Sequence, residues 1–187
     1  MKAVILDGSN DQNSTFTTVN PIVTSKFEEE GWAVDNYVLR KEKIATCIGC
    51  FGCWLKTPGV CILKDKGQKI AKKVIQADLV VMLTPITFGG YSYQLKKIVD
   101  RLIPNILPFF TRIGGEIHHQ PRYDKNPDML VIGYLPQPDA ECEDIFSKLI
   151  KRNAINMHCL HYQVDILTGD VDLGKVAQFI ENVKVLA

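Results

Sequence analysis

Short apolar runs alternate with amphipathic stretches along the whole chain. Five runs are rich in aliphatic and β-branched residues, as strands usually are: residues 2–6, 32–38, 79–83, 129–134 and 158–167. The first, third and fourth are almost continuously apolar, which is typical of strands that helices cover on both faces. The pattern therefore predicts a parallel sheet.

Amphipathic stretches that fit helices fill the intervals between these strands. They cover residues 14–30, 66–76, 93–103, 140–153 and 172 to about 185. Four of them follow a side chain that can cap a first helical turn: Asp65, Ser92, Asp139 and Asp172. Pro21 is expected to kink the first helix or to mark its true start.

This strict alternation predicts a fold class. Five strands and five helices without a linker-like break indicate one doubly wound α/β domain over residues 1–187, for which the flavodoxin-like strand order 2-1-3-4-5 is a common solution. Residues 104–127, after the third helix, are too long for an ordinary connection. We expect this insertion to form a hairpin or a lid.

Composition excludes several classes of partner. The chain has 22 Lys and Arg against 21 Asp and Glu, so it lacks the basic surplus of nucleic-acid-binding or membrane-surface proteins. No apolar stretch approaches the 18 or so residues that span a membrane. No export signal is visible either, so we expect a cytoplasmic location, where thiols stay reduced.

Two loops are expected at the carboxyl edge of the sheet, where such folds bind ligands. The first, residues 8–15 (GSNDQNST), combines a glycine turn, hydroxyls and a helix N-terminus, and so suits a phosphate. Ser14 could equally be an ordinary N-cap. The second, residues 84–92 (TPITFGGYS), places Pro and two glycines beside apolar side chains and suits a planar ring. Alternatively, it is only a rigid turn.

Four of the six cysteines lie in one short segment, residues 47–61 (CIGCFGCWLKTPGVC). In a reducing compartment a disulfide is disfavoured, which leaves an iron-sulfur cluster, a zinc ion or unliganded structural thiols. The two-residue gaps and one distant cysteine favour a cluster site over the paired spacing that zinc usually has. Cys142 and Cys159 fit the core.

The segments TPITFGGYSYQLKKIVDRL and GSNDQNST resemble the flavin sites of the flavodoxin-like NADPH-dependent FMN reductase family, and the likeness extends from residue 1 to about 101. The resemblance implies that FMN phosphate binds to Ser9, Asn13, Ser14 and Thr15. It also implies that the flavin ring lies against Thr84, Pro85, Ile86, Thr87, Phe88 and Gly89. Asn10 and Asp11 replace the Pro-Arg pair that is frequent in the family, so the phosphate is expected to rely on neutral donors.

The cysteine segment is similar to the motif of iron-sulfur flavoproteins, a branch of the same family. That similarity implies a [4Fe-4S] cluster on Cys47, Cys50, Cys53 and Cys61. Because the cysteines follow the second strand, they are expected at the same edge of the sheet as the flavin loops.

Together these features predict an FMN-dependent oxidoreductase that passes electrons to a small-molecule acceptor. Family likeness adds NAD(P)H as the donor and a homodimer or homotetramer as the assembly. The alternatives are an electron-transfer protein reduced by ferredoxin, a cluster-free FMN reductase, and a zinc-stabilised binding protein without flavin. No side chain is assigned as a catalytic acid or base, and His118 and His119 in the insertion have no assigned role.

Overall fold

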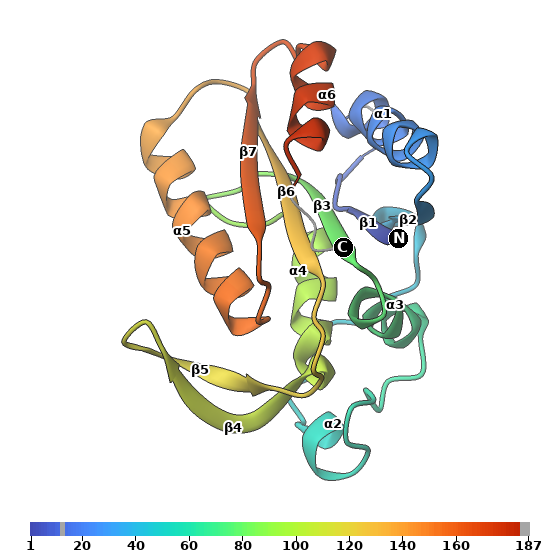
Figure 1. Ribbon diagram of the computed structural model, residues 1–187, viewed down its shortest axis with the longest axis vertical. Coiled ribbons are helices and arrows are strands. Elements are labelled where there is room, and N and C mark those ends of the chain that lie inside the picture. Colours follow the sequence, from blue (N-terminus) through green and yellow to red (C-terminus); the bar gives the residue numbers. More distant parts are fainter. Residues whose placement is uncertain (12–13, 184–187) are drawn as a thin grey trace.

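The computed structural model describes residues 1–11 and 14–183. Its central feature is a five-stranded parallel sheet in the order β2-β1-β3-β6-β7, accompanied by a separate antiparallel pair, β4-β5 (Figure 1). The sheet strands are β1 (Lys2–Asp7), β2 (Ala33–Val38), β3 (Leu79–Pro85), β6 (Asp128–Leu135) and β7 (Tyr162–Thr168). Counted within the sheet, this is the predicted order 2-1-3-4-5, and the fold class is confirmed.

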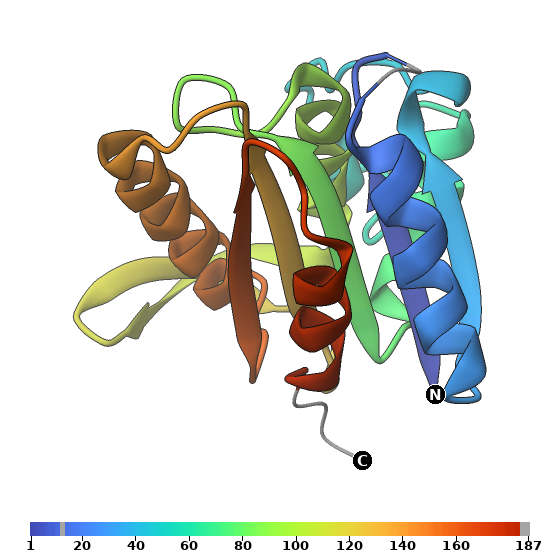
Figure 2. The same cartoon turned by 90° about the horizontal axis from the view of Figure 1, so that it is seen from above.

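Helices cover both faces of the sheet. They are α1 (Phe16–Glu29), α2 (Gly52–Leu55), α3 (Lys66–Ile75), α4 (Tyr93–Val99), α5 (Ala140–Asn156) and α6 (Leu173–Glu181), with 3-10 segments η1 (Leu39–Lys41) and η2 (Asp100–Asn105). In Figure 2, α1 and α6 lie together in front of the sheet. Helices α3, α4 and α5 pack on its other face.

The alternation of side chains along the strands explains these three layers. Ala3 and Ile5 of β1 pack with α1 and α6, whereas Val4 and Leu6 pack with the other helices. All four are at most 1% exposed, so each successive side chain enters a core on the opposite face. A strand that is buried on both faces must be apolar at every position, which is what the sequence shows.

Helix boundaries follow local chemistry closely. The four predicted N-caps are confirmed: the side chains of Asp65, Ser92, Asp139 and Asp172 each accept a hydrogen bond from a backbone N–H in the first turn. Pro21, however, lies inside α1 and does not mark its start.

The last predicted strand is also shorter than expected. It begins at Tyr162 instead of residue 158, because the chain turns after α5 with His158 at a φ of 55°.

The insertion forms a hairpin, one of the two predicted possibilities. Strand β4 (Ile106–Ile113) pairs with β5 (Glu116–Pro121), and the pair crosses beneath α5 and α4 in Figure 1. It is fastened to α5 by a hydrogen bond of 3.0 Å from the His119 N–H to Asn156 Oδ1. The His119 ring also packs, tilted, against the rings of Trp54 and Phe110. These contacts assign His119 a structural role.

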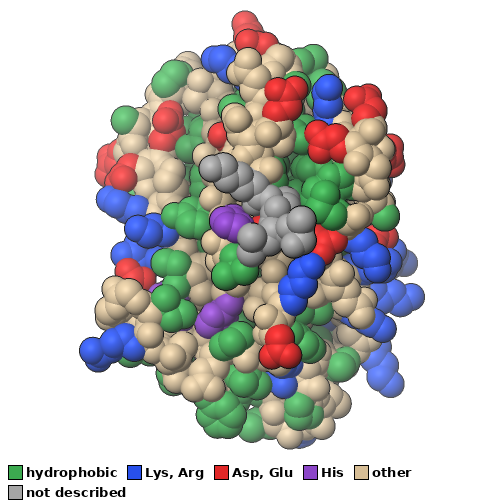
Figure 3. Space-filling model, in the orientation of Figure 1, with side chains coloured by type: hydrophobic (Ala, Val, Ile, Leu, Met, Phe, Trp, Pro, Cys, Tyr) green, Lys and Arg blue, Asp and Glu red, His purple; other side chains and the backbone are tan. Residues whose placement is uncertain are grey.

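Surface charge is unevenly distributed despite the small net charge. Lysines gather over α3, on the right of the view in Figure 3. They are Lys66, Lys69, Lys72 and Lys73. No helix in the described ranges is long and apolar enough to cross a membrane.

Candidate functional site: two turns and a cysteine loop

The turns that follow β1 and β3 lie side by side at the carboxyl edge of the sheet (Figure 2). Two hydrogen bonds tie them together: Gly8 N donates to Leu83 O at 2.7 Å, and Ser92 Oγ donates to Gly8 O at 2.5 Å. Because Ser92 also caps α4, one side chain fixes both the turn and the helix behind it.

Close packing at Gly8 leads to a prediction. A Cβ at this position would lie 2.7 Å from Leu95 Cβ and 3.0 Å from both Leu83 O and Ser92 Oγ. We expect Gly8→Ala to lower the free energy of unfolding by about 1–3 kcal/mol, because a well-packed core resists added atoms. Urea unfolding measures this change. Gly90→Ala is the control, since the nearest atom to its Cβ would be 3.5 Å away; equal losses in both variants would contradict the steric explanation.

The turn after β1 presents hydroxyls at the start of α1. Ser9 is 0% exposed, and its N–H donates to Asp7 Oδ1 at 2.8 Å. Thr15 occupies the N-cap position of α1 without a side-chain capping bond. Ser14 Oγ is buried and has no hydrogen-bond partner in residues 1–11 and 14–183. Ser14 is therefore not an ordinary N-cap, and its hydroxyl fits a phosphate at the helix N-terminus. Asn13 lies outside the described residues.

A basic side chain reaches this turn from another strand. Arg40, in η1 directly after β2, contacts Ser9 Oγ through Nη1. The turn therefore has a cation against it in addition to the neutral donors that the sequence predicts. Residues 8–15 themselves contain no Lys or Arg. The cation comes instead from the carboxyl end of β2, which lies next to β1 in the sheet.

The turn after β3 is rigid and mostly buried. Thr84 Oγ1 accepts from the Ser92 N–H at 2.9 Å, and Ile86 belongs to the core. Thr87 and Gly90 exchange two backbone hydrogen bonds, so Phe88 and Gly89 form the tip with positive φ values of 50° and 70°. Since Thr84 and Ile86 are buried, this turn can offer a ligand mainly backbone groups and the Phe88 ring, which is 100% exposed.

One ion pair, between the buried Arg101 and the partly buried Asp65, closes the neck of the cysteine loop, where Ala45 and residues 63–65 come together. Arg101 is 1% exposed and donates to Asp65 Oδ1 and Oδ2 at 2.8 and 2.9 Å. It also donates to Ala45 O and Leu63 O, at the two ends of the loop. The loop is therefore attached to η2, and Ser92, at the end of the turn after β3, is nine positions before Arg101. At 1.5 Å per residue that separation is roughly 14 Å.

All four predicted thiols converge on one pocket. Cys47, Cys50, Cys53 and Cys61 line it together with the Ile103 side chain of η2. Burial, followed by the charges of Cys61, Cys47 and Cys50, raises the pKa of the Cys53 thiol. However, within the described ranges no three His, Cys, Asp or Glu side chains are close enough to one another to hold a metal ion. The donor set fits a metal or cluster chemically, but the sulfur atoms do not form a coordination sphere.

The backbone between Cys47 and Cys53 has two left-handed residues. Phe51 has a φ of 52° and Gly49 a φ of 63°, and both values belong to the left-handed region. Gly52, which follows Phe51, donates its N–H to Cys50 Sγ at 3.5 Å and begins the single turn of α2. Strain of this kind at a non-glycine residue is typical of functional sites. The sequence did not predict the short helix α2.

The neck should make stability depend on pH. Burial acts to raise the pKa of Asp65, but hydrogen bonds from Arg101 and the Ala45 N–H hold that pKa below its usual value. A carboxylate whose pKa is lower in the folded state stabilises the protein above about pH 4, and this stabilisation is lost as the pH falls below that value. We expect the free energy of unfolding, measured with urea between pH 6 and 3, to decrease less with falling pH in Asp65→Asn than in wild type. Parallel curves for the two proteins would contradict this assignment.

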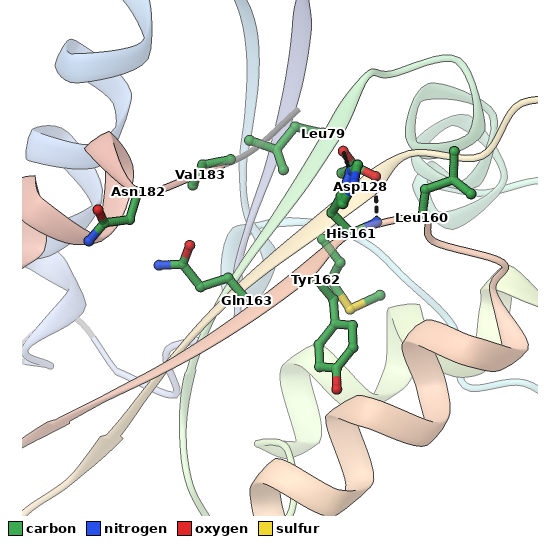
Figure 4. Close-up of a pocket in the computed structure, with 9 residues that line it drawn as sticks. Leu79, Asp128, Leu160, His161, Tyr162, Gln163, Asn182 and Val183 are labelled. Carbon is green, nitrogen blue, oxygen red and sulfur yellow. Dashed lines mark hydrogen bonds and ion pairs between the residues drawn. The ribbon is translucent and has the colours of Figure 1, made fainter. Parts of the chain in front are cut away.

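A separate cavity lies at the opposite edge of the sheet. It has a volume of about 350 Å³ and is lined by the starts of β3, β6 and β7 (Figure 4). Within it, His161 Nδ1 lies 3.1 Å from Asp128 Oδ2. Because its lining residues come from the amino ends of the strands, it is not part of the two turns.

Comparison with known proteins agrees with this geometry. Residues 1–118 match the NADPH-dependent FMN reductase family. An iron-sulfur flavoprotein of Methanocaldococcus jannaschii is 32% identical over 119 residues, which are 63% of this chain and 61% of that protein. The alignments with such relatives span about half of the relatives' own length.

Two solved structures share the fold. One is the NAD(P)H:quinone oxidoreductase from Methanothermobacter marburgensis, with a TM-score of 0.72 and 15% identity over 97% of this chain and 96% of that one. The other is an FMN-dependent NADH-azoreductase from Bacillus anthracis in complex with FMN, with a TM-score of 0.62 and 16% identity over 96% and 94% of the two chains.

The family match covers well over half of the chain and includes both turns and the cysteine loop. We conclude that this chain belongs to the NADPH-dependent FMN reductase family.

Proposed function

We propose that the protein is an FMN-dependent oxidoreductase that takes electrons from NAD(P)H and passes them to a small acceptor such as a quinone or a free flavin. The observation that carries this proposal is the pair of tied turns, one of which holds the buried Ser14 hydroxyl at the start of α1, without a hydrogen-bond partner among the residues that the structure describes. Bound FMN would supply hydride and one-electron chemistry.

The residues of the chain would position this flavin and control access to it. Ser9, Ser14 and Thr15 offer donors to the phosphate, assisted by the N-terminal dipole of α1. The turn from Thr84 to Gly89 would hold the ring mainly through backbone groups, because Thr84 and Ile86 face the core. Phe88, exposed at the tip, would provide the aromatic contact with the ring or with the acceptor.

The proposal includes a [4Fe-4S] cluster on Cys47, Cys50, Cys53 and Cys61. Three observations support it: the four thiols line one pocket, the Gly52 N–H donates to Cys50 Sγ, and the relative from M. jannaschii is named an iron-sulfur flavoprotein. The pocket borders η2 at Ile103, and η2 directly continues α4, which begins at the turn after β3. A cluster-free FMN reductase is the alternative within the same family.

An anaerobic titration tests the proposal. We expect purified protein to bind one FMN, and NADH or NADPH to bleach the flavin absorption within a catalytic cycle that reduces a quinone. Iron and sulfide assays on the same sample show whether the cluster is present. A protein that binds no FMN would refute the oxidoreductase, whereas FMN without iron would remove only the cluster.

One observation favours a second candidate, an electron-transfer protein reduced by another protein such as ferredoxin. Lys69, Lys72 and Lys125 line the same cavity, of about 690 Å³, as Cys61. Cations beside a redox centre would favour docking of an acidic partner. Reduction by ferredoxin at low salt, with no reduction by NADH or NADPH, would favour this candidate over the enzyme.

We also propose assembly as a homodimer or homotetramer. The β4–β5 hairpin exposes the large apolar side chains of Phe109, Phe110 and Ile117. An exposed apolar surface of this kind is frequent at subunit contacts. Light scattering on the purified protein measures the assembly, and a monomer at high concentration would contradict this part of the proposal.

A further inference from the structure

Arg40 places a positive charge against the turn that follows β1. Its side chain is only 16% exposed, and Nη1 contacts the buried Ser9 hydroxyl. The same Nη1 lies 3.9 Å from Asp7 Oδ2. Within the described residues, both contacts use a single nitrogen of a guanidinium that carries five N–H donors.

Asp7 does not need Arg40 to satisfy its hydrogen bonds. The Ser9 N–H donates to Asp7 Oδ1 at 2.8 Å, and Asn20 Nδ2 donates to Asp7 Oδ2 at 2.9 Å. The separation of 3.9 Å from Arg40 is too long for a hydrogen bond, so the carboxylate acts on Arg40 by charge alone. Asp7 can therefore orient the guanidinium without occupying its donors.

The turn has an evident use for such a cation. A phosphate monoester carries up to two negative charges near neutral pH, and the sequence of the turn supplies Asp11 but no Lys or Arg. Asp11 is exposed, whereas Arg40 reaches the turn from the side of β2. Arginine suits this role because its planar fork can donate two parallel hydrogen bonds to a phosphate.

We propose that Arg40 is the residue that binds the charge of the FMN phosphate, and that Asp7 and Ser9 hold its guanidinium ready. This inference deepens the proposed function and rests on FMN binding at the two turns. It explains how a chain without a basic residue in the phosphate loop retains a charged partner: the cation comes from the end of the neighbouring strand.

Riboflavin provides the discriminating probe, because it has the flavin ring but no phosphate. Fluorescence titrations of the apoprotein with FMN and with riboflavin compare wild type with Arg40→Gln, Arg40→Lys and the control Lys41→Gln. Lys41 is the exposed neighbour in the same 3-10 segment. We expect Arg40→Gln to weaken FMN binding about tenfold to a hundredfold, as the loss of a charged hydrogen bond does, and to leave riboflavin binding nearly unchanged.

The other variants complete the test. Arg40→Lys keeps the charge but loses the fork, so we expect a smaller loss confined to FMN. Lys41→Gln should behave as wild type with both ligands. KCl should weaken FMN binding to wild type more than to Arg40→Gln, because screening acts on the charge pair.

Each remaining outcome would overturn a definite claim. FMN affinity that is unchanged in Arg40→Gln, or an equal loss for FMN and riboflavin, overturns the role of Arg40 and leaves the proposed function intact. Wild-type protein that binds neither flavin refutes the proposed function, and the inference falls with it. Circular dichroism checks folding; if Arg40→Gln does not fold, the comparison of FMN with riboflavin in Arg40→Lys decides the question by the same criterion.

Discussion

Replacing Arg101 by methionine is expected to lower the free energy of unfolding by about 3 kcal/mol, the low end for a broken buried ion pair, because Asp65 is 19% exposed and keeps the N–H groups of Ala45 and Gly67. Arg101 is 1% exposed and bridges Asp65 and the carbonyl groups of Ala45 and Leu63. Without the guanidinium, the Asp65 carboxylate and both carbonyl oxygens lose donors. Chemical denaturation followed by circular dichroism measures the loss.

Arg112→Met is the matched control, because it is the same substitution at an exposed position of β4. We expect this control to stay within about 0.5 kcal/mol of wild type, as surface substitutions usually do. The double variant Arg101→Met with Asp65→Asn should recover part of the loss, because the buried charge is removed together with its partner. Equal losses for Arg101→Met and Arg112→Met would show that the neck does not stabilise the fold.

Replacing Cys53 by serine is expected to abolish stoichiometric iron and sulfide while FMN stays bound. Cys53 is the most buried of the four thiols that line the loop pocket, and a serine hydroxyl is a poor substitute for a thiolate ligand. The turns after β1 and β3, where FMN is proposed to bind, are built from other elements, so they should not depend on the loop. Iron, sulfide and FMN assays on one anaerobic preparation separate the two cofactors.

Cys142→Ser is the control for this substitution. Cys142 lies in α5, outside the loop, and its thiol contacts the backbone of Gly89, so it serves as a control for iron alone: its replacement should leave the iron content unchanged. A preparation of Cys53→Ser with the iron content of wild type would exclude Cys53 as a ligand. Wild-type protein that contains zinc but no sulfide would show that the cysteines form the zinc site that their spacing also permits, and not a cluster.

Much of the fold could be predicted from local signals. The apolar runs identified β1, β3 and β6 almost to the residue, and Asp65, Ser92, Asp139 and Asp172 each mark the start of a helix. These signals are reliable because a cap or a doubly buried strand depends on a few neighbouring residues. The differences fell at His158, where the chain turns before β7, at the short helix α2, and at Val99, where α4 gives way to the 3-10 segment η2.

The candidate site likewise has features that local sequence predicts and features that it does not. Sequence located Ser9, Ser14 and the turn from Thr84 to Gly89, because glycines and hydroxyls after a strand are visible as a local pattern. It gave no indication that Thr84 and Ile86 have buried side chains. Nor did it indicate that Arg101 closes the loop between Ala45 and Asp65, since these residues are far apart along the chain.

The order of apolar and polar residues was enough to determine the alternation of strands and helices, the parallel sheet and the presence of four grouped thiols. Only the tertiary structure decided which distant charges meet: Arg40 with the turn after β1, and Arg101 with the neck of the cysteine loop. The physical reason is that backbone patterns arise from neighbours within a few residues, whereas the position of a long charged side chain depends on which strands and helices are adjacent in space. Parallel pairing of β2 with β1 brings Arg40 to its place, and no spacing along the chain encodes that pairing directly.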